Sequence, residues 1–179
     1  EKPLLYANII SFVLTLCFLT VTAFLKRDAI NKLLYEIKKY GFSLNLYTSE
    51  WFILISSTVF WTCFIYRSFF MDGDHLFVGV SAFSDFGAHL PVIRSFSLGN
   101  NFPAQYPHFP DGTMRYHFMF YFMAANLEFL GFKLQHALNI PSILSLVSFS
   151  MLLYSLCVLL TKKPLAGVIS CILFAFRSS

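Results

Sequence analysis

The run "IPSILSLVSFSMLLYSLCVLL", residues 140–160, carries no charged side chain over 21 positions. About 20 apolar residues in a helix cross the hydrocarbon core of a bilayer, which is roughly 30 Å thick. Because unpaired backbone groups are costly in hydrocarbon, a spanning segment of this kind is a helix. This run therefore predicts a membrane-spanning helix, and lipid becomes the expected solvent for the neighbouring sequence.

The composition agrees with a lipid environment. Of the 179 residues, 57% are hydrophobic and 12% are charged, whereas about a quarter are charged in an average soluble domain. The 23 Phe residues exceed what the interior of a small soluble protein can bury. Most of this apolar surface is therefore expected to contact acyl chains or other helices.

The charges and cysteines exclude two classes of function. The net charge is +4, but the 13 Lys and Arg residues are spread along the chain and form no dense basic stripe, so nucleic acid is not an expected partner. The cysteines lie in apolar runs without CxxC spacing, which predicts neither a zinc site nor a disulfide framework. They are Cys17, Cys63, Cys157 and Cys171.

Further apolar segments lie on both sides of residues 140–160. They cover residues 3–25, 51–66, 114–132 and the beginning of a helix at 165–176. We expect an all-α fold, a polytopic transmembrane helix bundle with a long external loop that carries an interfacial helix. Residues 1–179 are interpreted as the N-terminal part of one transmembrane domain, and thus as a fragment of a larger membrane protein.

The connector at residues 26–50 sets the predicted orientation. It has five basic residues against three acidic ones, and its apolar residues recur at helical spacing, which predicts an amphipathic helix on a membrane surface. The positive-inside rule makes this connector cytoplasmic and the loop at 67–113 external. The same order of membrane crossings puts Lys162 and Lys163 on the external face, which conflicts with the positive-inside rule.

The external loop contains two polar motifs. "MDGDH" holds Asp72 and Asp74 around Gly73 and indicates a turn. "SDFGAHLPVIRSF", residues 84–96, holds Asp85, His89 and Arg94. Pro91 lies between His89 and Arg94. Because proline favours the first helical position and disrupts an interior, either a helix starts near residue 90 after a fixed loop, or it starts near Asp85 and kinks.

The 114–132 segment is more polar than the other apolar segments. Arg115, Tyr116 and His117 would lie at its external end, where Arg115 and Tyr116 could also be ordinary interface anchors. Asn126 and Glu128 lie further along, and ionisable groups inside membrane helices are functional candidates. Glu128 is also predicted near the cytoplasmic end, where its carboxylate could simply reach water.

Taken together, these features resemble the GT-C superfamily of polytopic membrane glycosyltransferases over about residues 51–176. The resemblance rests on a membrane helix, a long external loop with an Asp before an interfacial helix, and the quoted motifs "IRSF", "NFP", "MRYHF" and "LGFKLQHALNIPS". The superfamily includes oligosaccharyltransferase catalytic subunits and protein O-mannosyltransferases. The closest likeness is to an uncharacterised bacterial GT-C-like branch, which implies a bacterial plasma membrane and a role in the cell envelope.

The resemblance implies a reaction and its residues. The donor would be a sugar on a polyprenyl phosphate or diphosphate, and the early acidic residue of the loop, here Asp85, would act as catalytic base or metal ligand. Several GT-C enzymes carry paired acids at this point, whereas Ser84 and Phe86 flank Asp85. A divalent cation, Mg or Mn, would be the cofactor, with Asp72 and Asp74 as weaker candidate ligands.

Elementary chemistry favours the same assignment. Glycosyl transfer needs a carboxylate to take the acceptor proton and positive charge to stabilise the departing phosphate. Asp85 with His89 are the candidate catalytic residues. The planar guanidinium of arginine suits phosphate oxygens, so the candidate donor-phosphate residues are Arg94, Arg115 and His117.

Two other interpretations of the same residues stay open. The chain could be a non-catalytic GT-C-like scaffold or a transporter-like module, because fold does not fix function. Asp85 could also be only the N-cap of the interfacial helix. In that case asparagine, which caps as well as aspartate, would replace it without effect.

Overall fold

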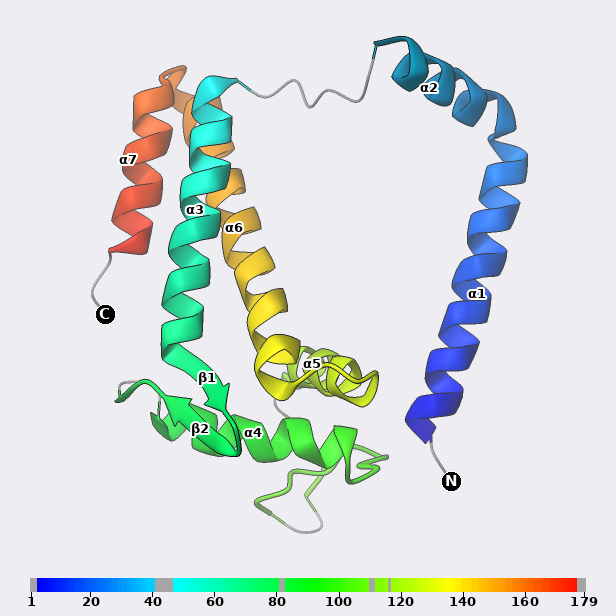
Figure 1. The fold of residues 1–179 in the computed structure, drawn as a ribbon, viewed down its shortest axis with the longest axis vertical. Helices are drawn as coiled ribbons and strands as arrows, with labels where there is room; N and C mark the ends of the chain where they lie inside the picture. Colours follow the sequence, from blue (N-terminus) through cyan, green and yellow to red (C-terminus); the bar gives the residue numbers. More distant parts are fainter. Residues whose placement is uncertain (1–2, 41–46, 81–82, 110–111, 116, 177–179) are drawn as a thin grey trace. The chain divides into compact units, whose positions relative to one another are not determined.

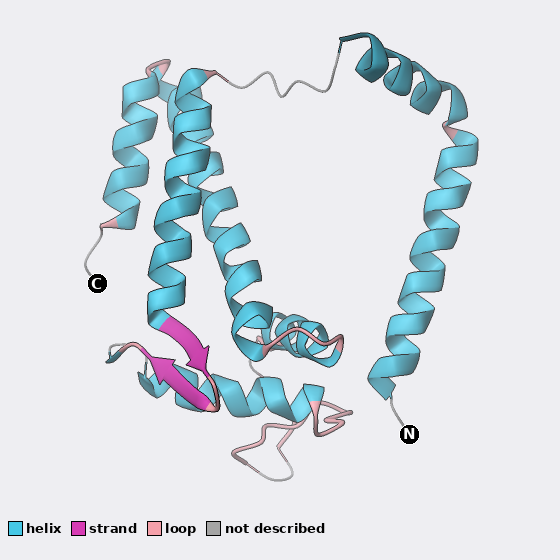
Figure 2. Ribbon diagram, viewed as in Figure 1, coloured by secondary structure: helices cyan, strands magenta, loops and turns pink. Residues whose placement is uncertain are grey.

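The computed structural model describes the following residues: 3–40, 47–80, 83–109, 112–115 and 117–176. They are mostly helical, with seven helices and one β-hairpin (Figures 1 and 2). The chain divides into two compact units, residues 1–45 and 46–179. Each unit is described by itself.

The first unit contains two helices. Helix α1 (Pro3–Leu25) is apolar over its whole length and is nearly all exposed. Helix α2 (Arg27–Tyr40) follows directly and is strongly amphipathic, with Asp28 in its first turn. An apolar helix with so little burial inside its own unit requires an apolar environment.

The second unit is built on two long helices that run in opposite directions. They are α3 (Thr48–Ser68) and α6 (Leu134–Thr161). Near the start of α3, the Tyr154 hydroxyl donates to the Ser49 hydroxyl at 2.7 Å. Near its end, the Tyr66 hydroxyl and His136 Nδ1 lie 2.8 Å apart. Contacts at both ends show that α3 and α6 lie side by side along their length.

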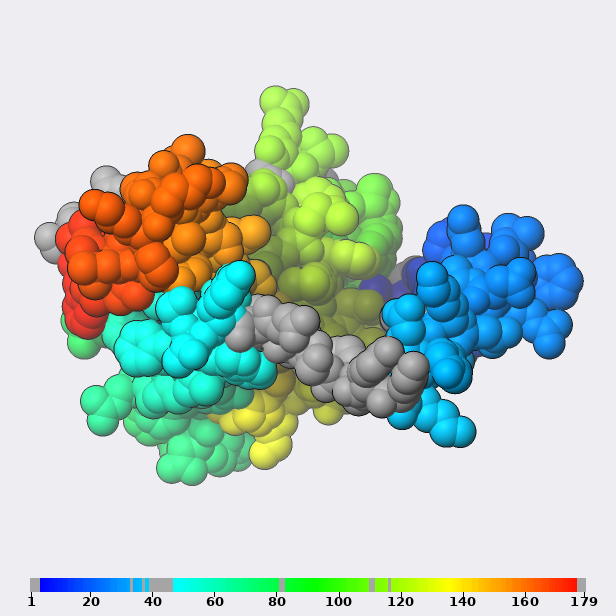
Figure 3. Space-filling view, turned by 90° about the horizontal axis from the view of Figure 1, so that it is seen from above, coloured from blue at the N-terminus to red at the C-terminus, as the bar shows by residue number. Residues whose placement is uncertain are grey.

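A buried polar contact joins α3 and α6 midway. Trp61 Nε1 donates to the Ser150 hydroxyl at 3.1 Å, and both residues are less than 10% exposed. Helix α7 (Pro164–Ala175) turns back along α6, where Gly167 lets its backbone approach the Tyr154 ring. Figure 3 views this end, with the start of α3 in cyan and the α6–α7 turn in orange.

Three of the described helices are long and apolar enough to cross a membrane. They are Leu4–Leu25, Thr48–Ser68 and Leu134–Thr161. The last of these extends six residues before the predicted start at 140 and has Pro141 in its interior. The extension persists because Leu134, Ala137 and Leu138 are buried, so tertiary packing offsets the hydrogen bond that the proline removes.

The chain between α3 and α6 folds into a compact head at one end of these helices (Figure 1). Its elements are β1 (Phe69–Asp72), β2 (His75–Val78), α4 (Phe83–Ser97) and α5 (Met119–Phe129). The two strands form an antiparallel hairpin whose turn uses Gly73 at φ +58°. This hairpin is absent from the all-α prediction, which took the same residues as a turn within a loop.

A shared apolar core holds the head together. Its buried residues come from β1, α4, α5 and the start of α6: Phe69, Val92, Ile93, Phe96, Ala124, Ala125, Leu134 and Leu138. Ala124 and Ala125 are fully buried, and their small side chains allow α4 and α5 to approach closely. The Asn139 amide ties the head to α6 by donating to the Phe69 carbonyl at 2.8 Å.

The prediction of a spanning helix over residues 114–132 is wrong. Helix α5 has 11 residues, which gives a length of about 16 Å, far short of a bilayer core. Its apolar residues pack against α4, and the chain before it is paired elsewhere, with the Met114 N–H bonded to the Ala104 carbonyl at 3.1 Å. Local apolar composition had suggested a span where tertiary packing makes a short core helix.

This correction changes which segments share an end of the molecule. With no spanning helix between α3 and α6, the head lies wholly at the end where α3 finishes, and Lys162 and Lys163 follow α6 at the other end. The structure thus puts these lysines and the head at opposite ends of α6, whereas the prediction put the lysines on the same face as residues 67–113. Glu128, expected near the face opposite that loop, belongs to the head as well.

Candidate functional site

Helix α4 carries the residues that the sequence singled out. It begins at Phe83 and continues through Pro91, so the helix starts before the proline. Asp85 lies in its first turn and is exposed, where the positive end of the helix dipole favours its carboxylate. Because Asp85 lies inside the helix, the interpretation of this residue as the N-cap is wrong.

His89 lies one turn after Asp85 on the same side of α4. Its imidazole stacks on the Tyr121 ring of α5, with ring centroids 4.7 Å apart and an angle of 21° between the planes. The histidine is half-buried by this contact. Tyr121 therefore fixes the ring one helical turn from the carboxylate, and α5 contributes directly to the surroundings of Asp85.

Asp85 and His89 line one pocket, which we call the Asp85 pocket. Its volume is about 250 Å³. The other lining residues come from α4, α5 and α6: Phe86, Leu90, Ile93, Phe120, Tyr121, Leu138 and Ser142. The walls are thus mostly apolar, while the carboxylate and imidazole at the first turns of α4 are its principal polar groups. Such a pocket suits a ligand with an apolar part and a reacting polar group.

The loop after α4 folds back onto the middle of that helix. A proline inside a helix cannot donate to the carbonyl four residues earlier and displaces the neighbouring hydrogen bonds. His108 Nε2 lies 3.2 Å from the Ala88 carbonyl, three residues before Pro91. Since a carbonyl can only accept, this nitrogen donates, so the loop is held against the helical turn that precedes Pro91.

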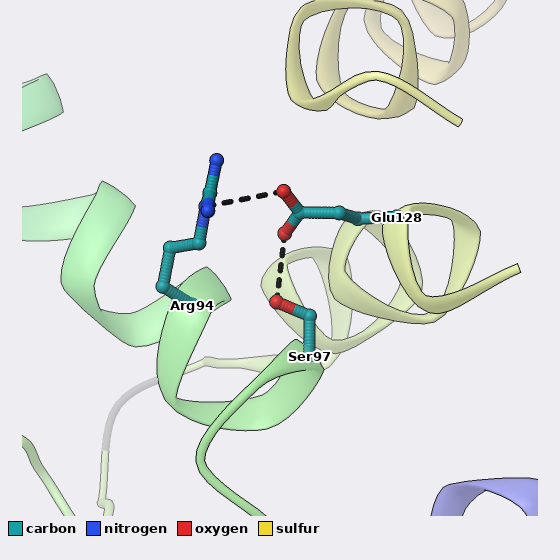
Figure 4. A network of polar contacts seen from close by, with 3 residues as sticks. All are labelled: Arg94, Ser97 and Glu128. Carbon is teal, nitrogen blue, oxygen red and sulfur yellow. Dashed lines mark hydrogen bonds and ion pairs between the residues drawn. The ribbon is translucent and has the colours of Figure 1, made fainter. Parts of the chain in front are cut away.

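Arg94 lies on the other side of α4 from Asp85. A separation of nine residues corresponds to about two and a half helical turns, which puts the two side chains on opposite sides of the helix and about 14 Å apart along it. Arg94 Nε contacts Glu128 Oε1 of α5 at 3.1 Å, and the Ser97 hydroxyl donates to Glu128 Oε2 at 2.7 Å (Figure 4). The structure therefore brings Asp85 and His89 together but separates Arg94 from them.

Glu128 is held by these two contacts. Its side chain is 12% exposed, so the prediction that its carboxylate reaches water at a cytoplasmic end is wrong. A carboxylate this buried requires compensation, which the Arg94 guanidinium and the Ser97 hydroxyl provide. The contact fixes α4 against α5, and neither Arg94 nor Glu128 lines the Asp85 pocket.

The remaining candidate residues are more peripheral. Arg115 and His117 are exposed on the segment that leads into α5, a few residues before Phe120 and Tyr121 of the Asp85 pocket. Asp72 and Asp74 are exposed at the tip of the β-hairpin. Among the described residues, no three His, Cys, Asp or Glu side chains gather as metal ligands.

The sequence did not point to several residues of the site. Phe120 and Tyr121 belong to the apolar run at residues 114–132, which was predicted to span the membrane. Leu138 and Ser142 lie in the quoted motif "LGFKLQHALNIPS", to which no role in a site was assigned. His108 lies in "YPHFP" between two prolines. A polar residue in a loop stiffened by prolines was the one sequence signal that could have pointed to His108. Their roles depend on how α5 and α6 pack on α4.

Comparison of this chain with family models, curated proteins and solved structures finds no match.

Proposed function

We propose that this chain forms part of an integral membrane glycosyltransferase that moves a sugar from a polyprenyl-phosphate-linked donor to an acceptor at the external membrane face. The observation that carries the proposal is the Asp85 pocket, with an exposed carboxylate and a stacked imidazole on mostly apolar walls. The pocket lies in the head at one end of α3 and α6, two helices that are long and apolar enough to cross a bilayer.

The distribution of basic residues supports the orientation. Lys162 and Lys163 lie at the end of the second unit where α3 begins, and in the sequence the basic connector at residues 26–50 runs up to the start of α3. Under the positive-inside rule this end is cytoplasmic and the head is external. In this proposal Lys162 and Lys163 no longer conflict with the positive-inside rule, because the conflict arose from counting residues 114–132 as a membrane span.

The proposed chemistry assigns a role to each group. Asp85 takes the acceptor proton as the acceptor oxygen bonds to the anomeric carbon and the bond from that carbon to the donor phosphate oxygen breaks. The electron pair of that bond leaves with the phosphate, which positive charge stabilises. His89 lines the same pocket and is a candidate for this charge. Arg115 and His117, which precede the α5 wall of the pocket in the sequence, are further candidates.

The apolar walls explain the choice of donor. Phe86, Leu90 and Phe120 line the pocket beside Asp85, and such a surface favours the first isoprenyl units of a lipid carrier over free water. The exposed carboxylate remains open to an aqueous acceptor. A divalent cation, Mg or Mn, with Asp85 as ligand remains part of the proposal; it would add positive charge at the leaving phosphate.

The test is a transfer assay on the full-length protein in lipid nanodiscs. Polyprenyl-phosphate donors with labelled sugars are supplied with candidate acceptors, with and without Mg²⁺ or Mn²⁺, and labelled product is separated from donor. We expect time-dependent transfer or slow hydrolysis of one donor. If no donor is consumed or bound, the non-catalytic scaffold or transporter-like module is the better description.

A further inference from the structure

A second pocket lies on the other side of α4, and we call it the Arg94–Lys133 pocket. It has a volume of about 310 Å³. Its walls come from the β-hairpin, α4, the end of α5 and the start of α6: Met71, Gly73, Arg94, Glu128, Phe132, Lys133, Leu134 and Gln135. Two cations therefore line one cavity at the place where the head joins α6.

The charges in this pocket leave an excess of positive charge. Both oxygens of Glu128 are engaged, one by Arg94 and one by Ser97, so its charge is offset within the protein. Lys133 adds a further positive charge and is exposed. The lining residues therefore carry one net positive charge, which favours an anion; Asp72 and Asp74 flank the lining residue Gly73 but do not line the pocket.

The ion pair with Glu128 uses only one nitrogen of Arg94. That nitrogen is Nε, and in Figure 4 the guanidinium extends beyond the contact, with a terminal nitrogen that no dashed line joins. The Arg94 side chain is 43% exposed. An arginine presented in this way can bind two oxygens of one tetrahedral anion.

We propose that the Arg94–Lys133 pocket binds a phosphate group. The phosphate could belong to a lipid headgroup or be free in solution. Lys133 directly precedes the apolar segment Leu134–Thr161, and headgroup phosphates lie at such ends of spanning helices. Because this pocket is on the opposite side of α4 from Asp85, the inference is independent of the proposed transfer reaction.

The experiment measures phosphate binding by the purified full chain in a maltoside detergent, which contains no phosphate. Inorganic phosphate is titrated in one arm and short-chain phosphatidic acid in the other, with isothermal calorimetry as readout. We expect saturable binding that weakens as salt is raised. Tighter binding of phosphatidic acid identifies a headgroup site, whereas equal binding of both probes identifies a site for free phosphate.

Two variants and one control locate the binding. Lys133→Met is expected to raise the dissociation constant at least about fivefold, whereas Lys162→Met, at the far end of α6, should leave it unchanged. Replacing Arg94 alone would leave the Glu128 carboxylate without its cation. Arg94→Gln is therefore combined with Glu128→Gln, and this double variant should also weaken phosphate binding. Wild-type affinity in either the Lys133 variant or the double variant would overturn the proposal, as would no saturable binding in both arms.

Discussion

Asp85→Asn is expected to lower the rate of sugar transfer by about 100- to 10,000-fold, the usual contribution of a positioned general base. Asparagine has nearly the same shape but cannot take the acceptor proton. The carboxylate is exposed in the first turn of α4, so its loss should cost no more than about 1 kcal/mol of helix stability. Activity and stability are therefore expected to separate in this variant.

The matched control is Asp28→Asn in the first turn of α2. Asp28 is also an exposed aspartate in the first turn of a helix, but it does not line the Asp85 pocket. Transfer is measured for both variants in nanodiscs at equal protein concentration, and hydrogen exchange of α4 checks that the helix is intact. Wild-type transfer by folded Asp85→Asn protein would remove Asp85 from the catalytic role.

Phe96→Ala is expected to give the largest loss of stability in the head, about 3–5 kcal/mol. Phe96 is fully buried and packs against three rings, with centroids 5.7 Å from Phe102, 5.8 Å from Phe118 and 5.6 Å from Phe122. Its removal leaves a cavity between α4, α5 and the loop that joins them. Since these helices also form the Asp85 pocket, transfer should fall with stability.

Phe83→Ala is the control for this variant, because it makes the same substitution on the same helix. Phe83 is 72% exposed, and its replacement should change stability by less than about 0.5 kcal/mol. Hydrogen exchange of the α4 and α5 amides gives the opening free energy of the head directly. Equal protection in the two variants would contradict the assignment of Phe96 to the centre of the core.

The long apolar helices could be predicted because their signal is local. Residues 3–25, 51–66 and 140–160 are apolar for long enough to span a membrane, and helices occupy these segments with ends shifted by a few residues. Residues 114–132 look similar by composition. There the distinction between a spanning helix and a short core helix depends on pairing with residue 104 and on packing against α4, which no local window contains.

The candidate site was predicted only in part for a related reason. Asp85 and His89 are four residues apart, and the helical period keeps them on one side of α4. Arg94 is close in sequence, but the same period carries it to the opposite side, where Glu128 binds it. Tyr121 and the other pocket residues of α5 and α6 join the site through tertiary contacts that the sequence pattern does not encode.

Helix α5 must not cross the membrane if the whole head lies at one face. Single cysteines are introduced by Arg115→Cys and Lys133→Cys, on either side of α5, and by Lys162→Cys beyond α6, in a variant without native cysteines. A membrane-impermeant maleimide is then applied to oriented vesicles. If α5 does not cross the membrane, positions 115 and 133 are labelled from the same face and position 162 from the other. Labelling of positions 115 and 133 from opposite faces would show that α5 crosses.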